Sequence, residues 1–299
     1  MADDAESSEL PPPTWGAALA WAARALGELA ALPGAPREAE VLLGHVTGAG
    51  RATVLAYPER SLTAAQRARL ADLVRRRAAG EPVAYLTGHR EFMGLDLLTD
   101  TRALIPRPET EHLVEAALAS LRTRLERGER PVVVDVGTGS GAIAVALAAR
   151  EPRQAMVFAT DISAPALALA EANAQSLGVA ERLVFLQGDL LAPLPDAPID
   201  LLLANLPYID PAEAPDLPPD VRDYEPALAL FGAGDGLGHI ARLLAEAAPR
   251  LAPGGECWLE IGYDQGKRAA ALARARFPGA AVAVRQDYAG LDRLLYIRG

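Results

Sequence analysis

The sequence predicts a doubly wound α/β domain that follows a small helical bundle, and three patterns support this division. From residue 131 onward, short apolar runs alternate with longer runs of helical periodicity, as expected for a parallel sheet covered by helices on both faces. A glycine-rich turn follows the first apolar run, Val132–Val136. Residues 15–80 instead show helical spacing, with Ala18, Ala22 and Leu26 on one apolar stripe.

The N-terminal part is predicted to contain a leader, a helical bundle and a connector. Residues 1–13 end in three prolines and are expected to be a loose leader, and a further helix is expected to begin after Ser61. We place the helical domain at residues 1–80. In the connector, residues 81–110, Val83–Leu86 and Glu91–Leu95 are predicted to form short strands joined by a turn, as in a hairpin.

The remaining residues, 111–299, are predicted to form the α/β domain. Expected strands lie at residues 132–136, 156–160, 183–186, 201–204, 258–261, 282–284 and 294–297. Expected helices lie at residues 142–149, 164–177, 240–251 and 267–277.

Composition limits the cellular setting. Cys257 is the only cysteine of the 299 residues, so the chain forms no internal disulfide, and we expect a small buried thiol in a reducing compartment. The first ten residues lack the basic region of a secretory signal. No uncharged apolar run reaches the roughly 18 residues that a membrane span needs. We therefore expect a cytoplasmic protein that does not bind membranes.

Charge argues against direct binding of nucleic acid. The formal net charge is -10, whereas affinity for nucleic acid comes largely from neutralising phosphates. Arg75-Arg76-Arg77 is a candidate basic patch, although a solvated helix face also accounts for it. The four histidines show no ligand spacing, so no metal site is predicted.

The glycine-rich turn predicts a cofactor site. It runs Asp135-Val136-Gly137-Thr138-Gly139-Ser140-Gly141 and ends where a helical run begins. Glycines at such a turn let the backbone approach a ligand closely, and the turn lies at the crevice beyond the carboxyl end of a strand.

Two cofactor classes are compatible with this turn. Gly137, Gly139 and Ala142 satisfy the looser dinucleotide fingerprint, and Asp161 could hold ribose hydroxyls in either class. Asp135, however, completes the D-x-G-x-G-x-G pattern typical of class I methyltransferases, which use S-adenosylmethionine. That resemblance implies that Asp135 lies near the methionine part and Asp161 at the ribose. It also implies that the segment containing Asp189 and Leu190 lies along the adenine.

A second candidate site follows the expected strand at 201–204. Asn205-Leu206-Pro207-Tyr208 resembles the signature of enzymes that methylate planar nitrogens, either amines of bases or side-chain amides. The lone pair of such a nitrogen is delocalised, so acceptors must orient it. The Asn205 side-chain oxygen and the Leu206 carbonyl could each accept one N–H, and Tyr208 could stack on the planar group. These four residues are the predicted catalytic set, with Asn205 also beside the cofactor.

Four sequence blocks resemble those of the protein-(glutamine-N5) methyltransferases (the PrmC/HemK family), which modify the glutamine of the Gly-Gly-Gln loop in peptide chain release factors. The blocks are residues 81–92, Leu104–Glu111, the glycine turn with Asn205–Tyr208, and Glu225–Leu228 with Gly234–Leu237. Their order and spacing fit from about residue 15 to the C-terminus. The Pro106-Arg107-Pro108-Glu109-Thr110 block is the most specific, since cofactor binding alone would not require it.

The resemblance implies a helical domain that contacts the release factor, a hairpin connector and a seven-stranded, Rossmann-like catalytic domain. It also implies that the substrate glutamine amide lies against Asn205 and the carbonyl of residue 206. For Arg107 and Glu109 two roles remain open: an ion pair that braces the connector, or a contribution to the substrate entrance. We expect a monomer whose partner is the release factor.

One departure from the family pattern leaves alternatives open. The family has Asn-Pro-Pro-Tyr, whereas Leu206 gives Asn-Leu-Pro-Tyr, which is typical of ribosomal RNA adenine-N6 dimethyltransferases. The substitution is tolerable because residue 206 contributes its carbonyl and Pro207 keeps it extended. Those RNA enzymes begin with the cofactor domain, whereas a helical region precedes it here. A non-catalytic cofactor-binding module that interacts with release factors is the second alternative.

Overall fold

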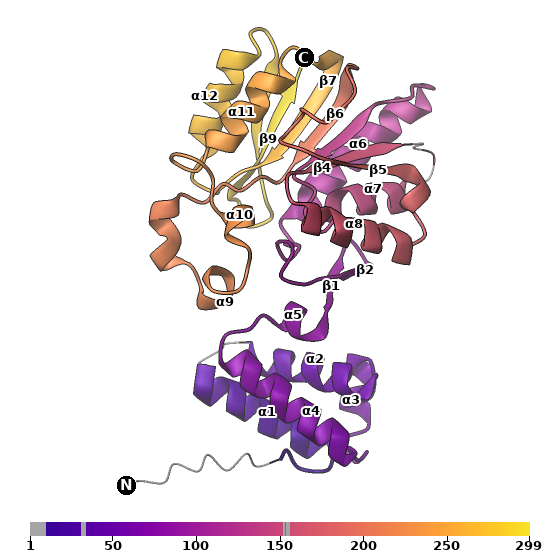
Figure 1. The fold of residues 1–299 in the computed structure, drawn as a ribbon, viewed down its shortest axis with the longest axis vertical. Coiled ribbons are helices and arrows are strands. Elements are labelled where there is room, and N and C mark those ends of the chain that lie inside the picture. The colour runs from indigo at the N-terminus through magenta and orange to yellow at the C-terminus, as the bar shows by residue number, and fades with distance from the viewer. Residues whose placement is uncertain (1–9, 31–33, 152, 154–155) are drawn as a thin grey trace. The chain divides into compact units, whose positions relative to one another are not determined.

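The computed structural model describes residues 10–30, 34–151, 153 and 156–299, and their contacts define two compact units (Figure 1). One unit contains the chain up to Gly88 together with Pro218–Tyr224, and the other contains His89–Leu217 and Glu225–Gly299. Residues 1–9 of the expected leader lie outside the described residues. The domain limits near residues 80 and 110 stay predictions.

Helices form the N-terminal unit, as the periodicity predicted. They are α1 (Trp15–Ala30), α2 (Ala35–Thr47), α3 (Arg51–Ala56), α4 (Ala64–Ala78) and α5 (Val83–Thr87). Leu26, Leu42 and Leu70 are fully buried in their shared core. Helix α4 begins where it does because Thr63 and Gln66 form a reciprocal capping box, with side-chain to backbone hydrogen bonds of 2.9 and 3.2 Å.

The arginine triplet of α4 is matched by acidic side chains of the same unit. Arg75 pairs with Asp72, and Arg76 donates to Glu81 at 2.7 Å. Arg77 is buried and donates to Glu38 at 2.8 Å, with Asp220 3.5 Å away. These contacts account for the triplet as part of the packing of this unit. Arg77, through Asp220, and the Tyr224 hydroxyl, which donates to the Ala79 carbonyl at 3.0 Å, both connect the segment Pro218–Tyr224 to the helices.

The prediction of a strand at Val83–Leu86 was wrong, because these residues form the short helix α5. Pro82 precedes the helix, and Gly88 ends it in the left-handed conformation with its N–H bonded to the Ala84 carbonyl. A four-residue apolar run has no periodicity that separates a strand from one helical turn. The proline and glycine at its ends decide the outcome.

A hairpin connector is confirmed, but not with the predicted strands, because Met93 and Gly94, predicted to lie within the strand Glu91–Leu95, form its turn. Strands β1 (His89–Phe92) and β2 (Leu95–Leu98) pair antiparallel through the two-residue turn Met93-Gly94. Both turn residues have positive φ, 53° and 70°, as a type I′ turn requires. This geometry matches the twist of the two strands and fixes their register.

The seven-stranded Rossmann-like sheet is confirmed. Its strands are β3 (Val133–Val136), β4 (Val157–Asp161), β5 (Leu183–Gln187), β6 (Ile199–Ala204), β7 (Leu251–Glu260), β8 (Ala281–Gln286) and β9 (Asp292–Arg298). Their order in space is β5-β4-β3-β6-β7-β9-β8. The first five are parallel, and β9 runs antiparallel between β7 and β8. The sheet is therefore mixed at one edge.

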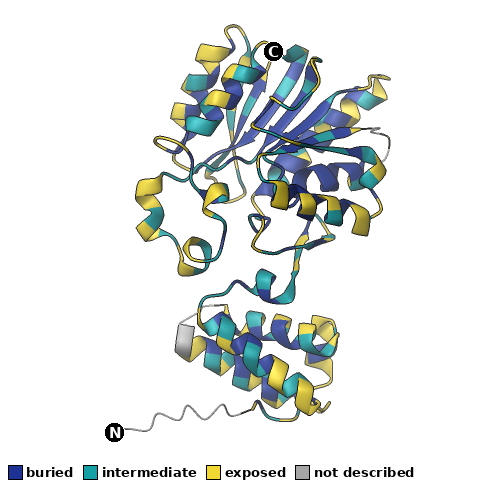
Figure 2. Cartoon of the chain, in the orientation of Figure 1, coloured by how far each residue is buried: buried dark blue, intermediate teal, exposed yellow. Residues whose placement is uncertain are grey.

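Helices cover both faces of this sheet, so the central strands β3 and β6 are almost entirely buried, whereas the edge strand β8 is not (Figures 1 and 2). Helices α6 (Thr110–Glu126), α7 (Ala142–Arg150) and α8 (Ala164–Ser176) cover one face, and α11 (Gly238–Ala247) and α12 (Gly266–Arg276) cover the other. Successive strand residues alternate between the two cores: Val133 packs in the first and Val134 in the second. Helix α6 was not predicted.

The helix predicted at 240–251 was too long. Helix α11 ends at Ala247, and Leu251 instead begins β7, where it pairs with Ile199. Pro253 disfavours a helical conformation at the residue before it, which helps to end the helix early. Four short helices were not predicted: η1 (Ala180–Arg182), η2 (Pro211–Asp216), α9 (Pro219–Arg222) and α10 (Ala227–Leu230). In the part of the chain that the structure describes, no helix is both long and apolar enough to cross a membrane.

Cys257 lies in β7 and is fully buried, and burial raises the pKa of its thiol to about 12. We expect the native protein to be inert to a thiol-specific reagent at pH 8, because both access and thiolate formation are suppressed. Addition of denaturant should release one reactive thiol per chain. Rapid labelling of the folded protein would contradict this burial.

Candidate active site

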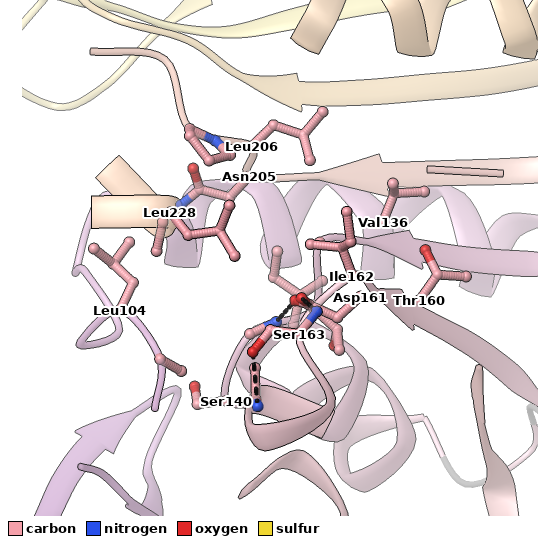
Figure 3. Close-up of a pocket in the computed structure, with 18 of the residues that line it drawn as sticks. Leu104, Val136, Ser140, Thr160, Asp161, Ile162, Ser163, Asn205, Leu206 and Leu228 are labelled. Atoms are coloured by element: carbon pink, nitrogen blue, oxygen red, sulfur yellow. Dashed lines mark hydrogen bonds between the residues drawn. The ribbon is translucent and has the colours of Figure 1, made fainter. Parts of the chain in front are cut away.

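The register of the sheet brings the predicted site segments to one edge. Val136 at the end of β3 pairs with Thr160 on one side and with Ala204 on the other. Three segments therefore end their strands at the same level: the glycine turn, Asp161 and Asn205. They do so at the topological switch point, where the connections on the two sides of β3 run to opposite faces of the sheet. They border a cavity of about 240 Å³. Figure 3 shows Asp161 and Asn205 entering it from different strands.

Most of the predicted site residues line this cavity, together with parts of the two family-like blocks. The predicted residues among its walls are Gly137, Thr138, Gly139, Ser140, Asp161, Asp189, Leu190, Asn205, Leu206 and Pro207. Asp135, Gly141 and Tyr208 do not line it. Asp135 and Gly141 instead form hydrogen bonds with Thr138, which does line it, and the Tyr208 hydroxyl donates to Glu260.

The glycine turn needs glycine at its ends for steric reasons. Gly137 has φ 70°, and a Cβ there would lie 2.8 Å from Cδ2 of Leu206. Gly141 has φ 82°, and a Cβ there would lie 2.9 Å from that of Ala170 on α8. Leu206 is itself buried, so its side chain fills the space beside the turn. Leu206, which stands where the family pattern has proline, thus packs against the glycine turn.

Asp135 stabilises the glycine turn through buried hydrogen bonds. It is fully buried, and its Oδ2 accepts hydrogen bonds from the Thr138 hydroxyl at 2.7 Å and the Ala144 N–H at 3.2 Å. Its Oδ1 has no hydrogen-bond partner among the described residues. Burial, opposed by these two hydrogen bonds, raises the pKa of Asp135 to about 7. The contribution of this residue is therefore to the shape and the charge of the turn.

Asp161 ties the turn to the next helix. Its two oxygens accept the N–H groups of Gly139 at 2.9 Å and Ser163 at 2.8 Å, and burial raises its pKa. Each carboxylate oxygen can accept more than one hydrogen bond. Because Asp161 also lines the cavity, it retains acceptor capacity for hydroxyl groups of a ligand.

Leu190 adopts a strained backbone conformation at the cavity wall. Its φ is 48°, which is uncommon for a residue with a side chain, and its carbonyl accepts the Thr160 hydroxyl at 3.0 Å. Its neighbour Asp189 pairs with Arg242 at 2.5 Å. The hydrogen bond from β4 holds this turn in place.

Asn205 and Tyr208 are connected by a chain of hydrogen bonds through Thr110 and Glu260. Asn205 Nδ2 donates to Oγ1 of Thr110 at 3.0 Å, and the Tyr208 hydroxyl donates to Glu260 at 3.2 Å. Burial, the largest cause, and the negative charge of Glu260 raise the pKa of Tyr208. The stacking role for Tyr208 stays a prediction, because the ring lies behind the cavity wall.

Two side chains that the sequence analysis did not single out hold the site together. Asn173 on α8 is fully buried and bonds both backbone groups of Leu98 and the carbonyl of Ser140, at 2.6 to 3.0 Å. It therefore joins the hairpin to the glycine turn. The only signal in the sequence is a single asparagine within an apolar helix.

Glu225 is the second such side chain. Its carboxylate accepts the Arg107 guanidinium at 2.5 Å and the Ile105 N–H at 3.1 Å, and the side chain is 1% exposed. Arg107 also lines the cavity. The ion pair joins two family-like blocks, and Arg107 forms part of the cavity wall, while a role at the substrate entrance stays a prediction. Glu109 is not its partner in this pair.

No cluster of three or more His, Cys, Asp or Glu side chains across residues 10–30, 34–151, 153 and 156–299 is arranged to hold a metal ion. The polar side chains at the cavity are instead one amide, several hydroxyls, two carboxylates, three guanidinium groups and one imidazole. Such groups suit an organic ligand with hydroxyl and amide functions.

Comparison with known proteins gives consistent matches along the chain. Residues 17–88 match the PrmC N-terminal domain, and residues 112–216 match the methyltransferase small domain. The release factor glutamine methyltransferase of Moorella thermoacetica is 50% identical over 86% of this chain and 88% of that protein. Its counterpart in Bordetella pertussis is 46% identical over 90% and 97%. This chain belongs to the release factor glutamine methyltransferase family.

The raised pKa of Asp135 predicts a pH-dependent stability. A carboxyl with a pKa of about 7 in the folded protein and about 4 when unfolded stabilises the fold at low pH, and this contribution is lost as pH rises through 7. Without ligand, the wild-type free energy of unfolding should fall by about 3 kcal/mol between pH 5 and pH 8 because of this group, and Asp135→Asn should remove that fall. Denaturant titrations at both pH values measure this. The exposed Asp264→Asn is the control, and parallel pH profiles for wild type and Asp135→Asn would refute the assignment.

The Arg107–Glu225 pair predicts a second effect on stability. Arg107→Met leaves a buried carboxylate without its cation and should lower the free energy of unfolding by about 3 kcal/mol. Glu225→Gln keeps acceptor capacity for Ile105 without a charge and should cost less. Arg102→Met is the matched control, because its partner Asp100 is 44% exposed and such pairs contribute below about 1 kcal/mol. Equal losses for Arg107→Met and Arg102→Met in denaturant titrations would exclude a buried pair.

Proposed function

We propose that this protein transfers a methyl group from S-adenosylmethionine to the side-chain amide nitrogen of the glutamine in the Gly-Gly-Gln motif of peptide chain release factors. The observation that carries this proposal is that Asn205 and the glycine turn border the same cavity, one residue beyond paired strand ends. A cofactor held by the turn and an amide held by Asn205 would thus meet. The names of the relatives supply the substrate.

The residues of the cavity fit this cofactor. Gly137 and Gly139 leave room for close approach of a ligand to the backbone, and Asp161 offers carboxylate oxygens for the two ribose hydroxyls. Ile162 and Leu190 provide apolar surface for the adenine, and Ile162 is exposed at the cavity. When bound, S-adenosylmethionine supplies an electrophilic methyl group on a sulfonium ion.

The protein's own contribution to the reaction is orientation of a weak nucleophile. The lone pair of an amide nitrogen is delocalised into its carbonyl, so the nitrogen must be held in a reactive direction. Oδ1 of Asn205 and the carbonyl of Leu206 would accept its two N–H groups and favour the positive charge that develops there. On transfer the glutamine nitrogen would gain the methyl group from the sulfonium, which would leave as a neutral thioether, and would lose one proton to water. Alignment of this kind contributes roughly 7–11 kcal/mol in favourable cases.

We further propose that the helical N-terminal unit recognises the release factor. The support is the match of residues 17–88 to the N-terminal domain of the family, and none of the described residues of that segment lines the cavity that holds Asn205. In this proposal the methyltransferase domain performs the chemistry, and the N-terminal unit selects the protein that carries the glutamine.

The assay is incubation of the purified protein with methyl-labelled cofactor and one acceptor at a time. We expect label in intact release factor and none in a release factor whose motif glutamine is replaced by alanine. Label in 16S ribosomal RNA but not in release factor would instead support the adenine methyltransferase. Tight binding of cofactor and release factor without any transfer would support the non-catalytic module.

Asn205→Ala should lower the rate of transfer by about 100-fold or more, because the substrate nitrogen loses one of its two oriented acceptors. Cofactor affinity, measured by calorimetry, should change little, and Asp264→Asn should match wild type in both measurements. An equal loss of transfer and of cofactor affinity would show that Asn205 serves mainly the cofactor.

A further inference from the structure

Glu260 is a buried carboxylate directly behind the Asn205 site. It ends β7, where its neighbour Leu259 pairs with Ala204 of β6, so Glu260 lies beside Asn205. Its side chain is not among the cavity walls, and the residue is 1% exposed. One oxygen accepts the Thr110 hydroxyl at 2.7 Å, and the other accepts the Tyr208 hydroxyl at 3.2 Å. Orientation of the substrate amide by Asn205 and Leu206 does not by itself use this group.

Thr110 connects Glu260 to Asn205. A threonine hydroxyl has one hydrogen and two acceptor positions. A carboxylate can only accept, so the Thr110 hydrogen is committed to Glu260. The oxygen of Thr110 can then only accept from Asn205, which it does at 3.0 Å. The Asn205 NH2 group therefore faces Thr110, and Oδ1 points to the other side of the amide.

The opposite orientation of the Asn205 amide is disfavoured by this arrangement. It would bring Oδ1 against the Thr110 oxygen with no hydrogen between them, at a position where Thr110 is buried. It would also present an NH2 group, rather than an acceptor, to the N–H groups of a substrate amide. The two orientations of Asn205 thus differ in whether they can bind the nucleophile.

We propose that Glu260, acting through Thr110, is a positioning residue that fixes the amide orientation of Asn205 so that its oxygen is offered to the substrate. The part of this inference that concerns substrate rests on the proposed function. Thr110 closes the Pro106–Thr110 block, so the proposal also explains why a methyltransferase would need that block. Its threonine is the link between β7 and the motif that follows β6.

The charges around Glu260 predict when the link weakens. Burial is the main cause that raises the pKa of Glu260, and the negative charge of Glu109 at the start of α6 raises it further. The hydrogen bonds from Thr110 and Tyr208 and the positive charge of Arg293 on β9 lower it. A protonated Glu260 can donate to Thr110, which frees the Thr110 hydrogen for a reversed Asn205. We therefore expect the rate of methyl transfer to decrease as the pH is lowered. This decrease should be smaller in Glu260→Gln than in wild type.

The first test needs no substrate. Asn173 and Asn205 are the only asparagines of the chain, so selective ¹⁵N-asparagine labelling yields two side-chain NH2 pairs in an NMR spectrum. Thr110→Val should shift one pair and speed its exchange with water, while Thr110→Ser should leave both near their wild-type positions. The Asn173 pair is the internal control. Tyr208→Phe, which removes only the other donor to Glu260, should leave the Asn205 pair in place.

The second test is kinetic. Thr110→Val should lower kcat for release factor by about tenfold or more, with cofactor affinity unchanged, and Thr110→Ser should restore most of it. The inference would be overturned if Thr110→Val kept the wild-type kcat. It would also be overturned if the Asn205 NMR signal were the same in wild type, Thr110→Val and Glu260→Gln. Thr110→Ser as impaired as Thr110→Val would overturn it too. An inactive wild type with the expected NMR shifts would instead refute the proposed function and leave the orientation of Asn205 established.

Discussion

The parallel register of β3 with its two neighbours is the constraint on which the site depends. Because Val136 is level with both Thr160 and Ala204, the segments that follow three strands leave the sheet together. A slip of one residue on either side would reverse the facing of every side chain beyond it. The glycine turn, Asp161 and Asn205 could then no longer border one cavity.

The buried polar groups around the cavity each join elements that are distant in sequence. Asn173 connects the hairpin to the glycine turn, and Glu225 connects Arg107 and Ile105 across about 120 residues. Glu260 connects α6 to the segment after β6. A buried polar group is costly without partners, so each such link is selective for one arrangement of the elements. The apolar cores provide the stability, and these links provide the alignment.

Much of the architecture follows from local patterns. Short apolar runs locate the seven strands of the main sheet, and the residues that follow those runs place the glycine turn and Asn205 at strand ends. Errors occurred where the pattern was too short or was interrupted. Val83–Leu86 has four apolar residues, which fit one helical turn as well as a strand, and the helix before Leu251 was extended through a strand start.

The sequence by itself determined the fold class and the positions of the glycine turn and of Asn205–Tyr208 at strand ends, because these depend on residues that are neighbours in the chain. Only the tertiary structure decided that Asp135 lies beneath the turn, that Arg107 pairs with Glu225 and that Glu260 stands behind Asn205. Those relations depend on which side chains meet after the sheet has closed. Periodicity reports which face a residue occupies, but not which distant partner satisfies a buried polar atom there.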